Sequence, residues 1–137
     1  MQSIRELMTP DPVCVPGTAT VCDAAQHMRE HDIGNVLIVD GDRLRGLVTD
    51  RDLVVRALAD GRGPDTPLTD LFSSDPVTVE ASDSADDAVR LMSEHAIRRL
   101  PVVDGGRPVG VVSIGDLAVE RDPKSALADI SAAPPNS

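Results

Sequence analysis

The stretch GLVTDRDL at residues 46–53 returns later in the chain as GVVSIGDL at residues 110–117. Each copy has a glycine, two apolar residues, a hydroxyl residue, two variable residues, an aspartate and a leucine. The apolar pair predicts a buried strand, and the hydroxyl residue predicts the start of a helix directly after it. Such a turn brings a hydroxyl, a carboxylate and free backbone amides to one point. These groups can hold a ribose and its phosphate.

The repeated stretch belongs to a longer internal duplication. Residues 4–53 align with residues 68–117 without a gap, and 19 of the 50 pairs are identical. A register held over that distance indicates a tandem duplication. A unit of about 50 residues buries too little surface to be stable alone. We therefore predict two repeats, related by a pseudo-twofold and packed through their sheets.

The repeat boundaries follow from composition. The first repeat is predicted at residues 1–66, with a linker rich in glycine and proline at 60–67, and the second at 67–122. Residues 123–137 are rich in small residues and proline, and we expect a partly flexible tail there.

Each repeat is predicted to fold as strand–helix–strand–strand–helix, an α/β (α+β) arrangement. An amphipathic turn precedes the first strand, and an Asp-Gly pair marks a hairpin between the second and third strands. For the first repeat the predicted elements are a turn at 4–8, strands at 13–15, 36–39 and 44–48, and helices after Thr20 and over 50–59. For the second repeat they are a turn at 68–72, ended by the Ser73-Ser74 break, strands at 77–79, 100–103 and 109–112, and helices after Ser84 and over 114–121.

Plain helix capping competes with ligand binding at the repeated turn. The first helix of each repeat starts with the same spacing of hydroxyl residue and aspartate, at Thr20 and Ser84, and these starts match capping boxes. The turns in 46–53 and 110–117 differ from these two helix starts, because a glycine and a buried strand come before the hydroxyl residue. Ligands tend to bind at strand ends near helix N-termini, and a glycine lets a backbone or ligand approach closely. Both interpretations remain open from spacing alone.

Composition excludes several classes of function. The net charge is −10 and Phe72 is the one aromatic residue, which argues against a nucleic-acid partner. No apolar run reaches the roughly 18 residues of a membrane span. The N-terminal residues lack the apolar core of a signal peptide, so we expect a cytoplasmic protein.

The cysteines and histidines give no catalytic or metal motif by sequence. Cys14 and Cys22 have no CxxC spacing, so a redox switch and two idle thiols are both open. No carboxylate or cysteine cluster is recognised at ligand spacing around His27, His31 and His95, and we predict no metal site. No nucleophile has a histidine base assigned by a motif, so we predict that the chain is not an enzyme.

The doubled unit resembles a pair of CBS domains, also called a Bateman module. Both copies carry that family's signature of glycine, two apolar residues, serine or threonine, two variable residues and aspartate. In addition, IRRLPVVD at residues 97–104 resembles the segment that leads into the family's second strand. The resemblance covers residues 3–122 and implies a stand-alone regulatory module of α/β repeats that has no activity of its own and requires no cofactor.

The resemblance also implies ligands and partners. The ligands would be adenosine-containing molecules (AMP, ADP or ATP, with NAD and S-adenosylmethionine as further candidates), bound in clefts between the repeats. The module would signal energy or metabolic state to an unidentified regulated protein, and it would form a homodimer through the helices of both repeats. The alternative is an interaction or dimerisation module whose nucleotide clefts are vestigial.

Site residues carry over from the family's motif positions. The residues implied for the ribose hydroxyls are Thr49, Asp52, Ser113 and Asp116; for the phosphates, Arg98, Arg99 and Arg51; and for the adenine pocket, Val13, Val15, Val77, Val79 and Pro101. The first repeat has the uncharged Gly34 and Asn35 where the second has Arg98 and Arg99. We therefore expect tighter binding where these two arginines can reach the ligand.

Overall fold

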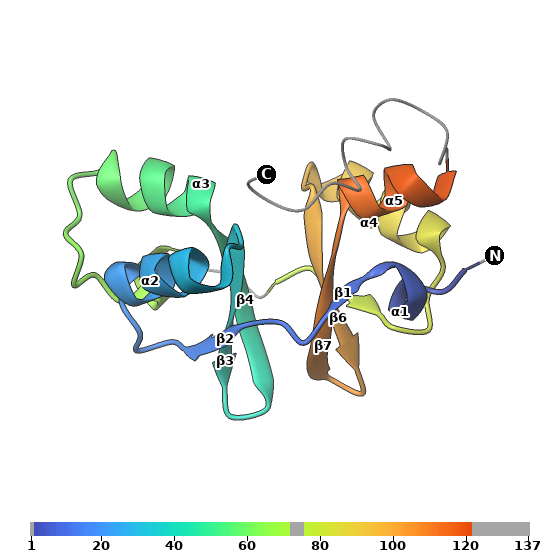
Figure 1. Cartoon of the computed structure of the whole chain (residues 1–137), viewed down its shortest axis with the longest axis horizontal. Coiled ribbons are helices and arrows are strands. Elements are labelled where there is room, and N and C mark those ends of the chain that lie inside the picture. Colours follow the sequence, from blue (N-terminus) through green and yellow to red (C-terminus); the bar gives the residue numbers. More distant parts are fainter. Residues whose placement is uncertain (1, 72–75, 122–137) are drawn as a thin grey trace. The chain divides into compact units, whose positions relative to one another are not determined.

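The computed structural model describes residues 2–71 and 76–121, with backbone alone for 119–121. The chain divides into two compact units (Figure 1). Unit 1 joins Met1–Pro12 to the segment that starts at Val77, and unit 2 covers Val13–Pro76. The predictions for Phe72, for the Ser73-Ser74 break and for the tail at 123–137 lie outside the described residues.

Unit 2 contains the three strands and two helices predicted for the first repeat. Its sheet has the order β2-β3-β4, with β2 parallel to β3 and β3 antiparallel to β4. Figure 1 shows the helices α2 and α3 on the same face of this sheet. The elements are β2 (Cys14–Pro16), α2 (Val21–His31), β3 (Asn35–Asp40), β4 (Arg43–Thr49), α3 (Asp50–Asp52), the π-helical η1 (Leu53–Leu58) and the 3-10 turn η2 (Leu68–Leu71).

Unit 1 repeats this arrangement with one more strand. Its sheet has the order β1-β7-β6-β5, in which β5 is parallel to β6 and the other pairs are antiparallel. The elements are α1 (Ile4–Leu7), β1 (Thr9–Pro10), β5 (Val79–Glu80), α4 (Ala85–His95), β6 (Arg99–Asp104), β7 (Arg107–Ser113) and α5 (Ile114–Arg121).

The order of strands and helices confirms the predicted repeat, and the hairpins have the predicted corner. Gly41 and Gly105 both adopt positive φ, at 64° and 61°, which an Asp-Gly corner favours. The strand β1 was not predicted, and two predicted elements differ in the structure. The second helix of the first repeat is α-helical only over Asp50–Asp52 and continues as a π-helix, and the strand predicted at 77–79 is reduced to Val79–Glu80.

The opening segment of each repeat packs in the unit that holds the other repeat. Ile4 is fully buried in the core of unit 1, and its backbone N–H donates to the Asp83 carbonyl at 2.8 Å. Leu68 is fully buried in the core of unit 2, and its N–H donates to the Ala19 carbonyl at 2.9 Å. The predicted boundary at 66/67 thus separates the two sequence repeats. The compact units differ from the repeats, because each unit contains the opening segment of one repeat and the remainder of the other.

Each unit has an aliphatic core between its sheet and its helices. In unit 1 the buried cluster includes Ile4, Val79, Ala88, Met92, Leu100, Val102, Val112 and Leu117. In unit 2 it includes Val15, Ala24, Met28, Val36, Ile38, Val48, Ala57 and Leu68. Within the described residues, no helix is both long enough and apolar enough to span a membrane.

Candidate functional site

The repeated turns are helix caps, as the spacing allows. In the first repeat the Thr49 N–H donates to Asp52 Oδ2 at 2.9 Å, and the Asp52 N–H donates to Thr49 Oγ1 at 3.1 Å. In the second, the Ser113 N–H donates to Asp116 Oδ2 at 2.8 Å, and the Asp116 N–H donates to Ser113 Oγ at 3.2 Å. Capping alone is therefore sufficient to explain the shared spacing. A ligand must use atoms that the caps leave available.

The two turns differ in the second carboxylate oxygen. Asp52 Oδ1 lies 3.4 Å from the Nε of Arg56, one helical turn later. The second repeat has Glu120 at the position of Arg56. Throughout the described segments, no hydrogen bond or ion pair reaches Asp116 Oδ1. Asp116 thus keeps an acceptor available on a half-buried carboxylate.

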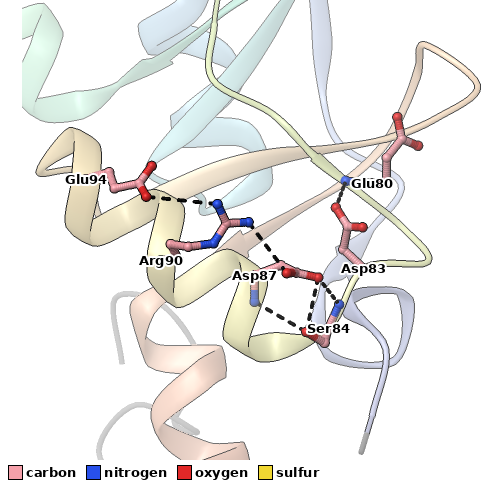
Figure 2. A network of polar contacts seen from close by, with 6 residues as sticks. All are labelled: Glu80, Asp83, Ser84, Asp87, Arg90 and Glu94. Carbon is pink, nitrogen blue, oxygen red and sulfur yellow. Dashed lines mark hydrogen bonds and ion pairs between the residues drawn. The ribbon is translucent and has the colours of Figure 1, made fainter.

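The pKa values separate this aspartate from an ordinary cap. Burial raises the pKa of Asp116 above its usual value, although the hydrogen bonds from the backbone and side chain of Ser113 oppose the shift. Asp87, in the cap at Ser84, has a lowered pKa because it accepts hydrogen bonds from the Ser84 backbone and side chain, and Arg90 attracts it further. Figure 2 shows these contacts around Asp87. The Asp116 carboxylate is partly removed from water, and a hydroxyl group that donates a hydrogen bond to it would stabilise its charged form.

Two predicted phosphate contacts lie beside the Ser113–Asp116 turn. The Ile114 N–H donates to the Arg98 carbonyl at 2.9 Å, and Arg99 pairs with Ser113 across β6 and β7. Arg98 is exposed and Arg99 half-buried, and neither side chain forms an ion pair with a described residue. Both arginines therefore keep guanidinium donors available on a segment whose backbone pairs with the turn.

The first repeat has the same backbone arrangement without these charges. There the Asp50 N–H donates to the Gly34 carbonyl at 3.0 Å, and Asn35 pairs with Thr49. Arg51 is exposed on the helix start, where its N–H donates to Asp50 Oδ1 at 2.8 Å. Arg51 is the phosphate contact predicted for this turn, and the other cation there, Arg56, lies against Asp52 Oδ1.

The residues predicted for the adenine pocket fall into two groups. Val15 and Val79 are core residues with 3% and 2% of their surface exposed, and Pro101 is also buried. Val13 and Val77 are half-buried and pack against the margins of the two cores. Among the five, Val13 and Val77 are the side chains with surface available to a ligand.

Gly110 allows a close backbone approach, as predicted, but the partner is part of the protein. A Cβ at this position would lie 2.5 Å from the Met8 Sδ and 2.7 Å from the Thr9 carbonyl oxygen. The strand β1 therefore fills the space that a side chain would need. In this copy the signature glycine is explained by packing of the opening segment.

The prediction that no carboxylate joins the histidines at ligand spacing is wrong. One ligand atom from each of His27, Glu30 and His31 lies within 4.8 Å of those of the other two. The signal was present in the sequence, because these positions follow the i, i+3, i+4 spacing that places side chains on one helix face.

Comparison with known proteins establishes the family. The family model described as the CBS domain matches residues 4–58 and again residues 68–121. The chain belongs to the CBS domain family. Its two matched segments coincide with the two sequence repeats, so the protein is a CBS pair.

Relatives of this CBS pair include stand-alone proteins of similar length. The CBS domain-containing protein YhcV of Bacillus subtilis is 38% identical over 135 residues, which cover 96% of each chain. Hypoxic response protein 1 of Mycobacterium tuberculosis is 41% identical over 120 residues, which cover 86% of this chain and 84% of the relative. The solved structure of hypoxic response protein I with two coordinated zinc ions has a TM-score of 0.77 and covers 88% of this chain and 99% of that one, at 39% identity. The structure of CBSX2 in complex with AMP has a TM-score of 0.74 at 27% identity and covers 88% of this chain and 96% of that one.

Proposed function

We propose that this CBS pair is a non-catalytic, cytoplasmic regulatory module that binds adenosine-containing ligands, with the Ser113–Asp116 turn as its stronger site. The ligands are AMP, ADP or ATP, with NAD and S-adenosylmethionine as further candidates. The observation that carries the proposal is the available Asp116 Oδ1 beside two arginines without ion pairs. The AMP complex of CBSX2 supports the ligand class.

The chemistry of the turn suits a nucleotide. A carboxylate accepts hydrogen bonds, and the two hydroxyls of a ribose can both donate to it. The raised pKa of Asp116 indicates a desolvated carboxylate, for which such donors are favourable. Guanidinium groups match phosphate oxygens and supply local positive charge on a protein of net charge −10.

Isothermal titration calorimetry with AMP, ATP, NAD and S-adenosylmethionine tests the proposal. We expect binding of at least one ligand, a tenfold or greater loss of affinity in Asp116→Asn, and a smaller loss in Asp52→Asn. Asp87→Asn is the matched control, because it changes a capping aspartate of the same geometry away from the proposed site. Heat from no ligand at millimolar concentration, or equal losses in Asp116→Asn and Asp87→Asn, would contradict the proposal.

The arginines have a separate test. Arg98→Ala and Arg99→Ala should each weaken binding of ATP and AMP while leaving the affinity for adenosine within about twofold, because a nucleoside lacks the phosphate that a guanidinium binds. Arg107→Ala, on the far end of the same hairpin, is the matched control. Equal losses for adenosine and ATP would place these arginines outside the phosphate site.

A homodimer is the proposed assembly, and exposed apolar side chains on the second helices support it. In unit 2, Val54, Val55 and Leu58 of η1 are 56%, 46% and 70% exposed, and in unit 1 Ile114 of α5 is 56% exposed. Apolar residues gathered on one short helix favour a protein partner. Sedimentation analysis should give a dimer that Leu58→Glu dissociates. A monomeric wild-type chain would favour the regulated protein as the partner of these helices, and with it the alternative of an interaction module.

A further inference from the structure

The C-terminal half of α2 gathers three side chains that are suited to a metal ion. His27, Glu30 and His31 occupy positions i, i+3 and i+4, and their ligand atoms lie within 4.8 Å of one another. The two imidazole rings are stacked, with centroids 6.0 Å apart and planes inclined by 17°. The helix itself therefore holds the side chains together, with no loop to rearrange.

The environment of His27 indicates a missing partner. Its Nδ1 is buried, and no hydrogen bond reaches it from the described residues. A buried ring nitrogen without a partner costs free energy, so no described group fixes the His27 imidazole through this atom. Glu30 and His31 are exposed, and His27, Glu30 and the exposed Asp23 line an open hollow of about 480 Å³ in unit 2. An ion can thus reach the cluster from solvent.

We propose that His27, Glu30 and His31 form a binding site for a divalent transition-metal ion of the zinc class. Imidazole and carboxylate ligands suit Zn²⁺, whereas Mg²⁺ and Ca²⁺ prefer sites made of oxygen alone. Zinc ligands at about 2.0–2.1 Å from the ion lie roughly 3.3 Å apart in a tetrahedral site. Small side-chain rotations close the observed cluster to that spacing. Water completes the coordination, as in other zinc sites with three protein ligands.

The second repeat provides an internal comparison. Its equivalent positions hold Leu91, Glu94 and His95, so one imidazole is missing. The Glu94 carboxylate also has a cation already, since Arg90 Nη1 lies 3.9 Å from its Oε1 (Figure 2). The first repeat has Gln26 at the position of Arg90. The metal site is therefore specific to α2, although the two helices share their fold.

Such a site would link metal supply to the stability of unit 2. An ion held between residues one turn apart fixes the last turn of α2, which ends at the left-handed residue Asp32. Because the ion binds the folded helix and not a disordered one, it raises the temperature of unfolding. This proposal is independent of nucleotide binding.

Calorimetric titration of the full chain, freed of metal with a chelator, with ZnCl₂ tests the site. We expect one zinc ion per chain, little heat from MgCl₂, and at least a tenfold loss of zinc affinity in His27→Leu, which copies the residue of the second repeat. His95→Ala is the matched control and should bind zinc as the wild type does. His31→Ala provides a second test in case His27→Leu does not fold, as circular dichroism will show.

Three outcomes would overturn the proposal. They are wild-type zinc affinity in both His27→Leu and His31→Ala, an equal loss in His95→Ala, or zinc binding that requires Cys14 and Cys22 and disappears in a chain with serine at both positions. Nucleotide binding is titrated separately on the metal-free chain, so that a failure to bind zinc and a failure to bind nucleotide can be told apart.

Discussion

Replacing Gly110 by alanine tests the packing of the opening segment on unit 1. The added Cβ would lie 2.5 Å from the Met8 Sδ and 2.7 Å from the Thr9 carbonyl oxygen. Carbon atoms do not approach neighbours this closely, so something must move. The Met8 side chain can rotate away, but the Thr9 oxygen belongs to the backbone of β1, which is paired with β7 at this point.

The expected cost follows from these two contacts. Overpacking of this kind typically costs about 1–3 kcal/mol, and the backbone contact favours the upper half of that range. For a domain of this size each kilocalorie lowers the unfolding temperature by roughly 3–5 °C. We therefore expect Gly110→Ala to unfold several degrees below the wild type. Amide hydrogen exchange should become faster in the opening segment more than elsewhere, because β1 is the element displaced.

Gly63→Ala is the matched control for this experiment. A Cβ on Gly63 meets no atom within 4 Å, and its φ is not positive, so the substitution should leave stability nearly unchanged or raise it slightly. Met8→Ala in the Gly110→Ala chain should restore only part of the loss, since the Thr9 contact remains. Equal unfolding temperatures for the Gly110 and Gly63 variants would refute the packing of β1 on β7.

Further predictions concern charges and the exchanged core residue. Burial raises the folded pKa of Asp116, so the stability of the wild type relative to Asp116→Asn should fall as pH rises from 3.8 through the folded pKa, measured by urea unfolding between pH 3 and 7. The pKa of Asp87 is lowered, so the charged carboxylate should stabilise the wild type over Asp87→Asn fully above pH 3.8, and this advantage should shrink as pH falls below 3.8. The same pH dependence of the stability difference for Asp116→Asn and Asp87→Asn would contradict the two assignments. Arg5→Ala removes an exposed ion pair to the β6–β7 hairpin and should cost less than about 1 kcal/mol, with no difference left in high salt; a larger cost would show a further role for Arg5. Leu68→Ala should cost about 2–5 kcal/mol in unfolding by urea because its side chain is fully buried; a cost below about 1 kcal/mol would contradict the assigned core.

The repeat order could be predicted from sequence because its signals are local. Capping spacing, Asp-Gly corners and apolar runs each specify a short segment, and the duplication presents every signal twice. The strand β1 was missed because two residues, one of them the proline Pro10, leave no alternation to recognise. Its partners Gly110 and Val111 lie at the other end of the chain, so no local pattern reports the pairing.

The pairing of hydroxyl residue and aspartate at each turn could be predicted from sequence, whereas the difference between the two turns lies in side-chain contacts. Spacing alone cannot separate a cap from a ligand turn, since all four turns form capping boxes with similar distances. The distinguishing contact runs from Arg56 to Asp52 Oδ1, just beyond the aligned repeat; the second repeat has glutamate at that position, Glu120, which carries no positive charge. The proximity of His27, Glu30 and His31 could have been predicted from sequence, because their spacing places them on one helix face.

The exchanged segments impose an order on biosynthesis. Unit 2 is continuous in sequence, so all of its elements are synthesised before β7. Unit 1 is discontinuous: Arg5 pairs with Asp104, 99 positions later. The opening residues are therefore made first but cannot take their place until β7 has emerged. Once β7 has emerged, its outer edge is open to strands from other chains until β1 pairs with it at Gly110 and Val111.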